Sequence, residues 1–309
     1  GAAPAPAELA LVQFSSGSTV DPKPVALTHA ALAAQADALL AATHACPEDV
    51  LVSWLPLYHD MGLVGALLAA MSYPGPLVLI PPEHFLARPA LWPRAIARHR
   101  GTISAAPSFA YAYAADRVKE AELAGLSLAS WRLALDGAEP VSPQAMRRFA
   151  ERFARAGFDG RALVPVYGLA EAALAVTFRR PGAALAGRRV DAVALARDGA
   201  VVPGAREVVP VGTPVPGVEV ALRDGEGRLL YEEAYTRAGF DGPYTLAYHA
   251  RRPHATHAAE ARHGWPAPAA APPRSLLKRH YRSQDLAGRG GPPVDARVPL
   301  LFNSDLVLS

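Results

Sequence analysis

Hydroxyl groups and a lysine gather in one short stretch near the start of the chain. Residues 14–25 read F-S-S-G-S-T-V-D-P-K-P-V. The groups that could hold an anion come from Ser15, Ser16, Gly17, Ser18, Thr19 and Lys23. Small side chains let the backbone close around a phosphate, and hydroxyl and ammonium groups donate hydrogen bonds to its oxygens. The stretch therefore predicts a phosphate-binding loop. A serine-rich surface turn is the alternative, and the G-x-x-x-x-G-K-[ST] pattern is absent.

Three further segments carry aromatic, histidine and carboxylate side chains after this loop. They read W-L-P-L-Y-H-D-M-G at residues 54–62, D-G-A-E-P at residues 136–140 and Y-G-L-A-E at residues 167–171. In this order, and together with the loop, they resemble the motifs of the adenylate-forming superfamily. That superfamily includes acyl-CoA synthetases, luciferases, peptide-synthetase adenylation domains and fatty acyl-AMP ligases. The first and third segments are most similar to the fatty acyl-AMP ligase branch, and the resemblance covers about residues 8–230.

This resemblance implies ATP-dependent activation of a fatty acid, or another carboxylic acid, to an acyl-adenylate with release of pyrophosphate. Such chemistry depends on positioning and charge stabilisation more than on covalent help from the protein. The loop and Lys23 would hold the β- and γ-phosphates, Glu171 would bind Mg²⁺, and His59 would face the acyl carboxylate and the nucleotide. The expected catalytic residues are Lys23, His59 and Glu171. The nucleotide would also contact Gly137, Ala138, Glu139, Tyr167, Gly168 and Ala170, with Tyr167 stacked on adenine. An acyl carrier protein is one candidate acceptor of the acyl group.

The candidate side chains also have ordinary structural alternatives. An isolated histidine is often a satisfied core residue, but Tyr58 and Asp60 beside His59 favour a site. Glu139 and Glu171 could instead cap helices, since carboxylates stabilise helix starts. The motif favours a site for Glu171, whereas both interpretations stay open for Glu139.

Two positions depart from the usual pattern of the superfamily. Val20 stands where most members have Gly, so the loop would be stiffer and would grip a phosphate less closely. Ala170 stands where most members have Thr, which matches the ligase branch. That change removes one hydroxyl that could contact a phosphate.

Strands and helices alternate along the segment that carries these motifs. Strands are predicted at residues 9–14, 51–55, 77–80, 103–105, 133–136 and 163–166. Helices are predicted at residues 29–43, 62–72, 89–99, 108–121 and 143–155, with Thr28 as an N-cap. This alternation predicts an α/β fold with a doubly wound, mostly parallel sheet. Ligands bind beyond the carboxyl ends of such strands, so Tyr58, Gly137 and Tyr167, each expected directly after a strand, would converge at one edge.

Residues 104–115 read S-A-A-P-S-F-A-Y-A-Y-A-A and follow one of the predicted strands. Small residues beside Phe109, Tyr111 and Tyr113 could leave an apolar slot for a lipid chain. A packed core helix explains the same pattern, and the sequence does not decide between the two.

The resemblance divides the chain into four parts. Residues 1–7 are an Ala/Pro-rich linker, residues 8–210 form the AMP-binding α/β core, and residues 211–230 begin a small β-barrel subdomain. Residues 231–309 resemble the N-terminal part of a homogentisate 1,2-dioxygenase-like cupin protein and predict a small segment rich in strands and loops. The segments that carry this second resemblance read T-R-A-G-F-D-G-P-Y-T-L-A-Y-H at 236–249, H-G-W at 263–265 and P-L-L-F-N-S-D at 299–305.

Several parts of a complete adenylate-forming enzyme are not found in the sequence. These are the subdomain before residue 9, the G-E-I strand, the T-G-D motif whose Asp holds the ribose, the hinge and the C-terminal domain with its catalytic Lys. Ordering of such active sites depends on that mobile domain, so we expect the middle of a longer enzyme. Two alternatives are an inactive truncated or chimeric fragment that at most binds nucleotide, and a remnant of a dioxygenase-like oxidoreductase.

Composition excludes several other classes of protein. Residues 231–309 hold 10 of the 31 Lys+Arg and 7 of the 28 Asp+Glu, so residues 1–230 carry 21 of each sign and predict no nucleic-acid partner. No apolar run is long enough for a membrane span, and no signal peptide is visible. The single cysteine, Cys46, suits a reducing cytoplasm. Five of the 10 histidines lie in the tail, and their spacing fits no zinc pattern: His249, His254, His257, His263 and His280.

Overall fold

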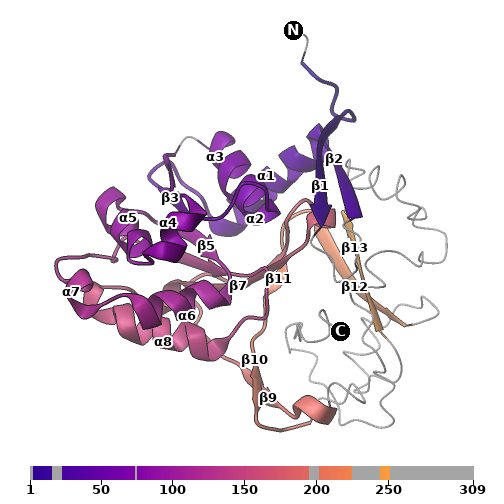
Figure 1. Cartoon of the computed structure of the whole chain (residues 1–309). Helices are drawn as coiled ribbons and strands as arrows, with labels where there is room; N and C mark the ends of the chain where they lie inside the picture. Colours follow the sequence, from indigo (N-terminus) through magenta and orange to yellow (C-terminus); the bar gives the residue numbers. More distant parts are fainter. Residues whose placement is uncertain (1–2, 16–22, 74, 195–201, 225–243, 251–309) are drawn as a thin grey trace. The chain divides into compact units, whose positions relative to one another are not determined.

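The computed structural model describes residues 3–15, 23–73, 75–194, 202–224 and 244–250 (Figure 1). By its internal contacts the chain divides into two compact units. Unit 1 comprises Gly1–Ala31, Gly187–Val208 and Gly217–Ser309, and unit 2 comprises Leu32–Ala186 and Val209–Pro216. Each unit contains sheets of its own.

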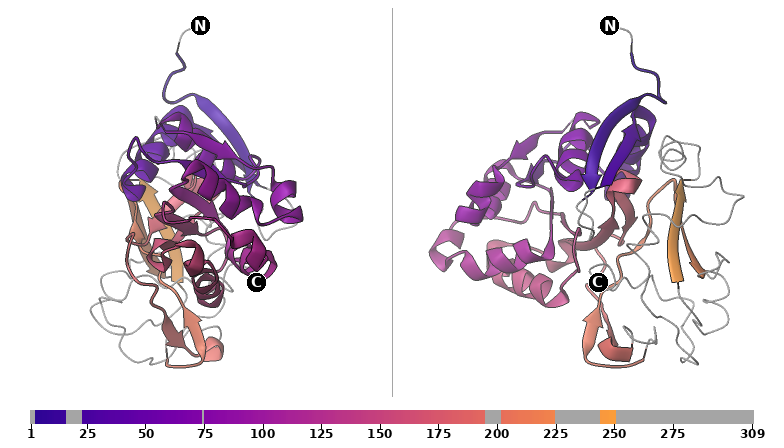
Figure 2. Two further views of the ribbon diagram at one scale, coloured as in Figure 1. Left: turned by 90° about the vertical axis from the view of Figure 1, so that its left-hand side faces the viewer. Right: turned by 45° about the vertical axis from the view of Figure 1, so that its right-hand side comes forward.

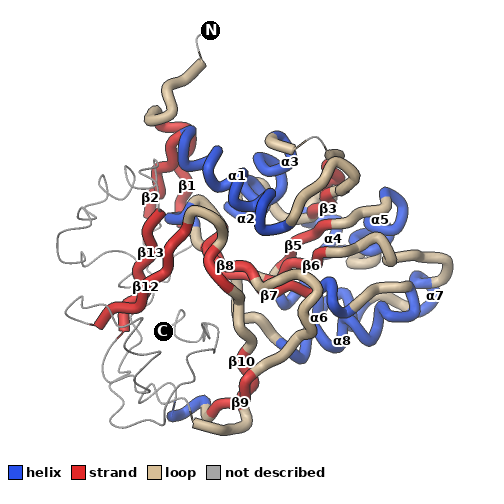
Figure 3. Tube along the Cα trace, turned by 180° about the vertical axis from the view of Figure 1, so that it is seen from behind, coloured by secondary structure: helices blue, strands red, loops and turns tan. Residues whose placement is uncertain are grey.

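A seven-stranded sheet runs through unit 2 (Figure 3). In order across the sheet its strands are β11 (Thr213–Pro214), β8 (Ala175–Phe178), β7 (Leu163–Gly168), β6 (Leu133–Asp136), β5 (Ile103–Ala106), β3 (Leu51–Ser53) and β4 (Leu77–Leu79). The five strands from β7 to β4 are parallel, whereas β8 and β11 run antiparallel to their neighbours. The prediction of an α/β fold with a mostly parallel sheet is therefore confirmed.

Helices precede or connect the parallel strands of unit 2. They are α1 (His29–Thr43), α2 (Asp60–Gly62), a π-helical turn (Leu63–Leu68), α3 (Ala69–Met71), α4 (Pro82–Ala87), α5 (Leu91–His99), α6 (Ser108–Arg117), α7 (Glu120–Leu123) and α8 (Pro143–Phe153). The strand order reverses direction at β4. Because crossovers between parallel strands are right-handed, the helices that connect β3 to β4 lie on one face of the sheet, and those that connect β5 to β6 and β6 to β7 lie on the other. Figure 1 shows this arrangement, with α2 and α3 on one side of the sheet and α6 and α8 on the other.

An aromatic core packs α5, α6 and α8 against the sheet. Its largest fully buried side chains include Trp92, Tyr111, Trp131, Phe149 and Phe153. The ring centroids of Trp92 and Trp131 lie 5.1 Å apart at an angle of 67°, a favourable edge-to-face geometry. On α8, Met146, Phe149 and Phe153 recur at the spacing of one helical face and are buried. This packing holds the helices, and hence the strand ends, in one arrangement.

A charged network joins the amino ends of the central strands. Asp49, before β3, is 2% exposed and accepts hydrogen bonds from Arg132 Nε at 2.7 Å and Thr102 Oγ1 at 2.7 Å. Arg132, before β6, also forms a second contact with the same carboxylate and donates to the carbonyl of Thr43 at 2.9 Å. The network therefore links the end of α1 to three strands.

Unit 1 contains, among its described residues, three pairs of strands, each from a different part of the sequence. β1 (Leu9–Ser15) and β2 (Lys23–Thr28) form an antiparallel hairpin, drawn in indigo in Figure 2. β9 (Arg188–Val190) pairs with β10 (Arg206–Val208), and β12 (Val218–Asp224) pairs with β13 (Tyr244–Ala250). In the hairpin Ser15 pairs with Lys23, so the two ends of the predicted phosphate loop lie opposite each other.

Most predicted elements match the structure, and the differences have physical reasons. The helix at His29–Thr43 and the strand at Leu133–Asp136 agree at both ends. The prediction missed β2, where prolines at 22 and 24 disfavour a strand, but a two-stranded ribbon tolerates Pro24 at its edge. The predicted helix at residues 108–121 was wrong at its end, because Val118 is extended and divides it into α6 and α7.

Candidate functional site

Three of the four sequence motifs meet at one edge of the unit 2 sheet. Residues 54–62 follow β3, residues 137–140 follow β6, and residues 167–171 begin within β7. Because these strands are parallel, their carboxyl ends share one edge, and β6 and β7 are direct neighbours. A Cβ added to Gly137 would lie 2.7 Å from Cγ2 of Val166, so the second motif packs against the strand that carries the third. The expected convergence of these three segments is therefore present within unit 2.

Most of the predicted phosphate loop lies outside the described residues. Ser15 is the last residue of β1 and Lys23 the first of β2, whereas the residues between them, including Ser16, Gly17, Ser18 and Thr19, lie outside the described residues. The role of the loop and of Lys23 in binding phosphates stays a prediction.

His59 caps the short helix α2 and pairs with the residue after it. The backbone N–H of Met61 lies 3.2 Å from His59 Nδ1 and 2.6 Å from Asp60 Oδ1. His59 Nδ1 is also 2.8 Å from Asp60 Oδ1. The neutral ring can therefore accept the hydrogen bond from Met61, whereas the protonated ring donates to Asp60 and leaves Asp60 as the acceptor for Met61. The hydrogen bond with Asp60 raises the pKa of His59 above its ordinary value, although burial opposes the rise. The side chain of His59 is 41% exposed and that of its neighbour Tyr58 projects further into solvent.

This pair predicts a pH-dependent contribution to stability. Since the pKa of His59 is raised in the folded protein, the contribution is fully present below the unfolded pKa, about 6.5, and is lost as the pH rises through the folded value. We expect His59→Asn to lower the melting temperature at pH 6 and to have little effect at pH 9, as measured by thermal unfolding. His29→Asn, at an exposed position of α1, is the control. An equal loss at both pH values would contradict the role of the pair.

The second motif is attached to the start of α6. Glu139 Oε1 accepts a hydrogen bond of 2.5 Å from the backbone N–H of Phe109, in the first turn of that helix. This is the helix-capping arrangement that the sequence left open for Glu139. The preceding residue, Ala138, has φ of 68°, a left-handed conformation that is unfavourable for a residue with a side chain. The surrounding contacts therefore hold the loop in a strained shape at the sheet edge.

The third motif forms the end of β7 and the turn after it. Tyr167 lies inside β7 rather than after it, because β8 pairs with this strand as far as Gly168. The backbone passes so close that a Cβ on Gly168 would be 2.0 Å from the carbonyl oxygen of Leu174, which only glycine avoids. Glu171 is half-buried in the 3-10 turn Ala170–Ala172. The motif thus lies at the carboxyl end of β7, the strand that pairs with β6.

Helix α6 contains both residues expected in an acyl pocket and residues of the core. Tyr111 is fully buried and donates a hydrogen bond of 2.8 Å to the carbonyl of Leu135, which fits the packed-helix interpretation. Phe109 is 46% exposed and lies 6.1 Å from Trp54, centroid to centroid, at the motif edge. Of these two residues, only Phe109 is accessible to a ligand.

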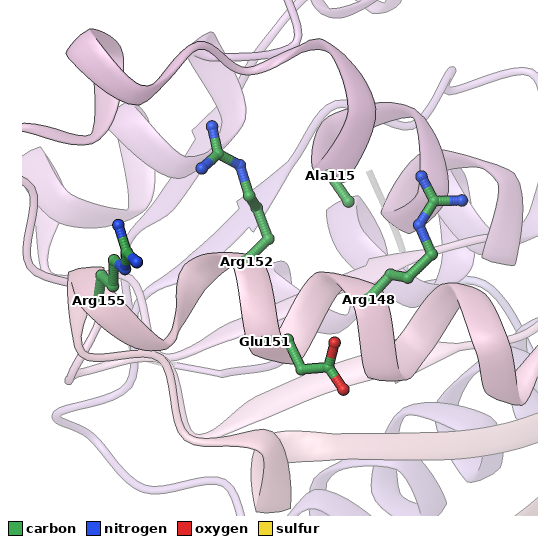
Figure 4. Close-up of a pocket in the computed structure, with 5 residues that line it drawn as sticks. All are labelled: Ala115, Arg148, Glu151, Arg152 and Arg155. Carbon is green, nitrogen blue, oxygen red and sulfur yellow. The ribbon is translucent and has the colours of Figure 1, made fainter.

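A separate cleft of about 370 Å³ lies between α6 and α8 (Figure 4). It is lined by Ala115, Arg148, Glu151, Arg152 and Arg155. Arg148 pairs with Asp116, and Arg152 pairs with Glu120 and donates to the carbonyl of Val118 at 2.9 Å. No motif residue lines this cleft, so it is not the candidate site.

Metal and membrane features were sought over the part of the chain that the structure describes. Within it, no group of three or more His, Cys, Asp or Glu side chains could hold a metal ion. None of its helices has both the length and the apolar character that a membrane crossing requires.

The sequence analysis included Asp136 in the second motif and Ser108 in the segment 104–115, but it assigned neither side chain a role of its own. Asp136 ends the apolar strand L-A-L-D, and Ser108 begins α6. Ser108 Oγ donates a hydrogen bond of 2.6 Å to Oδ2 of Asp136, the first residue of the second motif. The signal for Asp136 was a carboxylate at the end of an apolar strand, whereas nothing local distinguishes Ser108.

Comparison with known proteins gives consistent matches. The AMP-binding enzyme family matches residues 1–234. A Caulobacter vibrioides relative, provisionally named as an acyl-CoA synthetase, is 35% identical over 84% of this chain and 47% of its own length. A medium-chain-fatty-acid–[acyl-carrier-protein] ligase of Teredinibacter turnerae is 40% identical over 56% of this chain and 27% of its own length. The chain thus spans less than half the length of these relatives.

Solved structures agree with the sequence comparisons. A structure from studies of fatty acyl-adenylate ligases of E. coli and L. pneumophila matches 80% of this chain and 45% of its own, with a TM-score of 0.73 and 35% identity. The L. pneumophila fatty acyl-adenylate ligase in complex with acyl adenylate and pyrophosphate matches 82% of this chain and 45% of its own, with a TM-score of 0.66 and 32% identity.

Proposed function

Because the chain belongs to the AMP-binding enzyme family, we propose that it takes part in the ATP-dependent conversion of a fatty acid to an acyl-adenylate. The observation that carries the proposal is the convergence of residues 54–62, 137–140 and 167–171 at one edge of a mostly parallel sheet. The likeness to fatty acyl-adenylate ligases, at 35% identity and a TM-score of 0.73, supports the choice of a fatty acid.

In the proposed reaction a carboxylate oxygen attacks the α-phosphorus of ATP. A bond between that oxygen and phosphorus forms, the bond from the α-phosphorus to the bridging oxygen breaks, and pyrophosphate leaves with the electron pair. Tyr167 would stack on adenine, with Gly137, Ala138, Glu139, Gly168 and Ala170 around the nucleotide. His59, as an imidazolium beside Asp60, would present positive charge to the acyl carboxylate. Lys23 and the hydroxyl-rich loop would hold the outer phosphates.

Mg²⁺ fits the donor set at this edge. When bound, the ion would neutralise charge on phosphate oxygens. Mg²⁺ keeps several waters and binds through one or two carboxylates plus phosphates, so a single half-buried Glu171 suffices as the protein ligand. A cage of several acidic side chains is not required.

The finer parts of the proposal go beyond the family. Some relatives are named as acyl-carrier-protein ligases, which supports an acyl carrier protein as the acceptor. The domain boundaries at residues 7, 210 and 230 and a cytoplasmic location stay predictions. So does the dioxygenase-like identity of residues 231–309, which lie outside the described residues except for β13.

The proposal is tested by ATP–pyrophosphate exchange with medium-chain and long-chain fatty acids, measured beside ATP binding to the same preparation. Exchange that depends on fatty acid would support it. Binding without exchange would favour a fragment that only holds nucleotide. If neither is found, only the family relationship remains.

A further inference from the structure

Asp136, the first residue of the second motif and the last of β6, is a buried carboxyl group. Its side chain is 0% exposed, and its Oδ2 has one protein partner, the hydroxyl of Ser108 at 2.6 Å. Its Oδ1 is buried without a hydrogen-bond partner among the described residues. A fully buried polar atom in this condition calls for a physical explanation.

The surroundings of Asp136 provide no compensating positive charge among the described residues. Its neighbours across the sheet are Ala106 on β5 and Pro165 on β7, both without charge. The titratable groups that act on it are Glu139, on the loop after β6, and Tyr111, on α6. On α8 the first-turn residues 143–146 carry no charge, and the following arginines lie on the exposed face.

An ionised carboxylate here would be buried without a cation, which is far more costly than burial of the neutral acid. Burial raises the pKa of Asp136 well above its ordinary value, the hydrogen bond from Ser108 opposes the rise, and the charge of Glu139 adds to it. Geometry and charge therefore agree that the folded protein holds a proton on Asp136. Protonation of Oδ1 also leaves Oδ2 free to accept the hydrogen bond from Ser108.

Asp136 is also the centre of a set of links between three elements. Ser108, at the start of α6, accepts a hydrogen bond of 2.8 Å from the backbone N–H of Ser142, the N-cap of α8. Glu139 accepts a hydrogen bond from Phe109 in the same turn of α6. The loop at residues 137–141 is thus held at both ends by the first turn of α6.

We propose that Asp136 is a positioning residue, held as a neutral carboxylic acid, which through Ser108 and Ser142 fixes the loop that receives the nucleotide. Only the identity of the ligand rests on the proposed function. The protonated acid and the fixed loop rest on contacts within unit 2.

The first test measures stability as a function of pH for the wild type, Asp136→Asn and Asp37→Asn. Below the unfolded pKa of an aspartate, about 4, the folded and the unfolded protein both hold the proton. The contribution of Asp136 to the stability of the folded protein is then fully present. At higher pH only the unfolded chain releases the proton. The folding equilibrium constant of the wild type then falls by up to about tenfold per pH unit until the folded pKa is reached.

The amide of Asn does not titrate, so Asp136→Asn is expected to remove this slope at pH values above the unfolded pKa of about 4. Asp37 is exposed on α1, and its variant should keep the wild-type slope. Parallel curves for the wild type and Asp136→Asn would overturn the neutral acid.

The second test measures hydrogen exchange of the amides of Gly137 and Ser142, which donate to the carbonyl of Ala106 and to Ser108 Oγ. Asp136→Asn should keep these amides protected, whereas Ser108→Ala, a milder change than Asp136→Ala, should increase their exchange rate by about tenfold or more beyond any change that the global stability explains. Unchanged protection in Ser108→Ala would overturn the positioning role.

ATP binding provides a third readout that separates this inference from the proposed function. Ser108→Ala should weaken ATP binding while Asp136→Asn should not. If the wild type does not bind ATP, the proposed function fails, but the exchange and pH measurements still decide on Asp136. If Ser108→Ala exchanges faster yet binds ATP as the wild type does, the loop does not receive the nucleotide.

Discussion

Glu171→Gln is expected to lower fatty-acid-dependent ATP–pyrophosphate exchange by about 100-fold or more, the scale for loss of one group that stabilises transition-state charge. Glutamine has nearly the same size as glutamate but no charge, so its oxygen is a much weaker ligand for a hard cation. Glu171 is half-buried in the 3-10 turn after β7. The expected loss rests on the proposal that its carboxylate holds Mg²⁺ on the phosphates.

The measurement is exchange at several Mg²⁺ concentrations, together with thermal unfolding. Partial recovery at high Mg²⁺ and an unchanged melting temperature would identify a weakened metal site rather than a damaged fold. Glu151→Gln changes an exposed glutamate in the α6–α8 cleft by the same chemistry and should leave exchange unchanged. Wild-type exchange in Glu171→Gln would exclude Glu171 as the metal ligand while leaving the proposed reaction intact.

Arg132→Met is expected to lower the free energy of unfolding by about 3 kcal/mol, because it leaves the carboxylate of Asp49 buried without its cation. Asp49 is 2% exposed, and two of its hydrogen bonds, from Arg132 Nε and Thr102 Oγ1, are each 2.7 Å. The substitution also removes the hydrogen bond of 2.9 Å from Arg132 to the carbonyl of Thr43. Urea unfolding of both proteins measures the difference.

Two further variants make this result specific. The double variant Arg132→Met with Asp49→Asn removes both charges and should recover part of the loss. Arg161→Met breaks the exposed pair with Asp159, whose side chains are 72% and 50% exposed, and should change stability little. A loss as large in Arg161→Met as in Arg132→Met would show that burial is not the cause.

Acid unfolding tests the same pair independently. Burial raises the pKa of Asp49, but hydrogen bonds from Arg132 and Thr102 outweigh it and lower the pKa to about 2. The stabilisation is present above the unfolded pKa of about 4 and is lost as the pH falls toward 2. In Arg132→Met this acid-dependent loss should become smaller, because the folded pKa of Asp49 is no longer lowered by the guanidinium.

Local patterns predicted the elements well where one rule dominated. The apolar strand at Leu133–Asp136 and the helix at His29–Thr43 were recognised because composition and boundary signals agreed. β8 was missed because its short sequence, A-V-T-F, gives little sign that the chain turns back and pairs antiparallel with β7. The break between α6 and α7 was missed because residues 108–121 are continuous in helix-compatible composition.

The amino-acid sequence by itself determined the order of the motifs and their attachment to strand ends. It thereby determined the α/β fold and the edge at which three motifs meet, because parallel strands place their carboxyl ends together. Only the tertiary structure decided which side chains are buried and with what partners. Asp49 pairs with Arg132, and Glu139 caps α6, although the partners lie far apart in the sequence. The burial of Asp136 Oδ1 without a partner among the described residues likewise depends on several elements. Such contacts depend on how helices pack on the sheet, and no local periodicity records them.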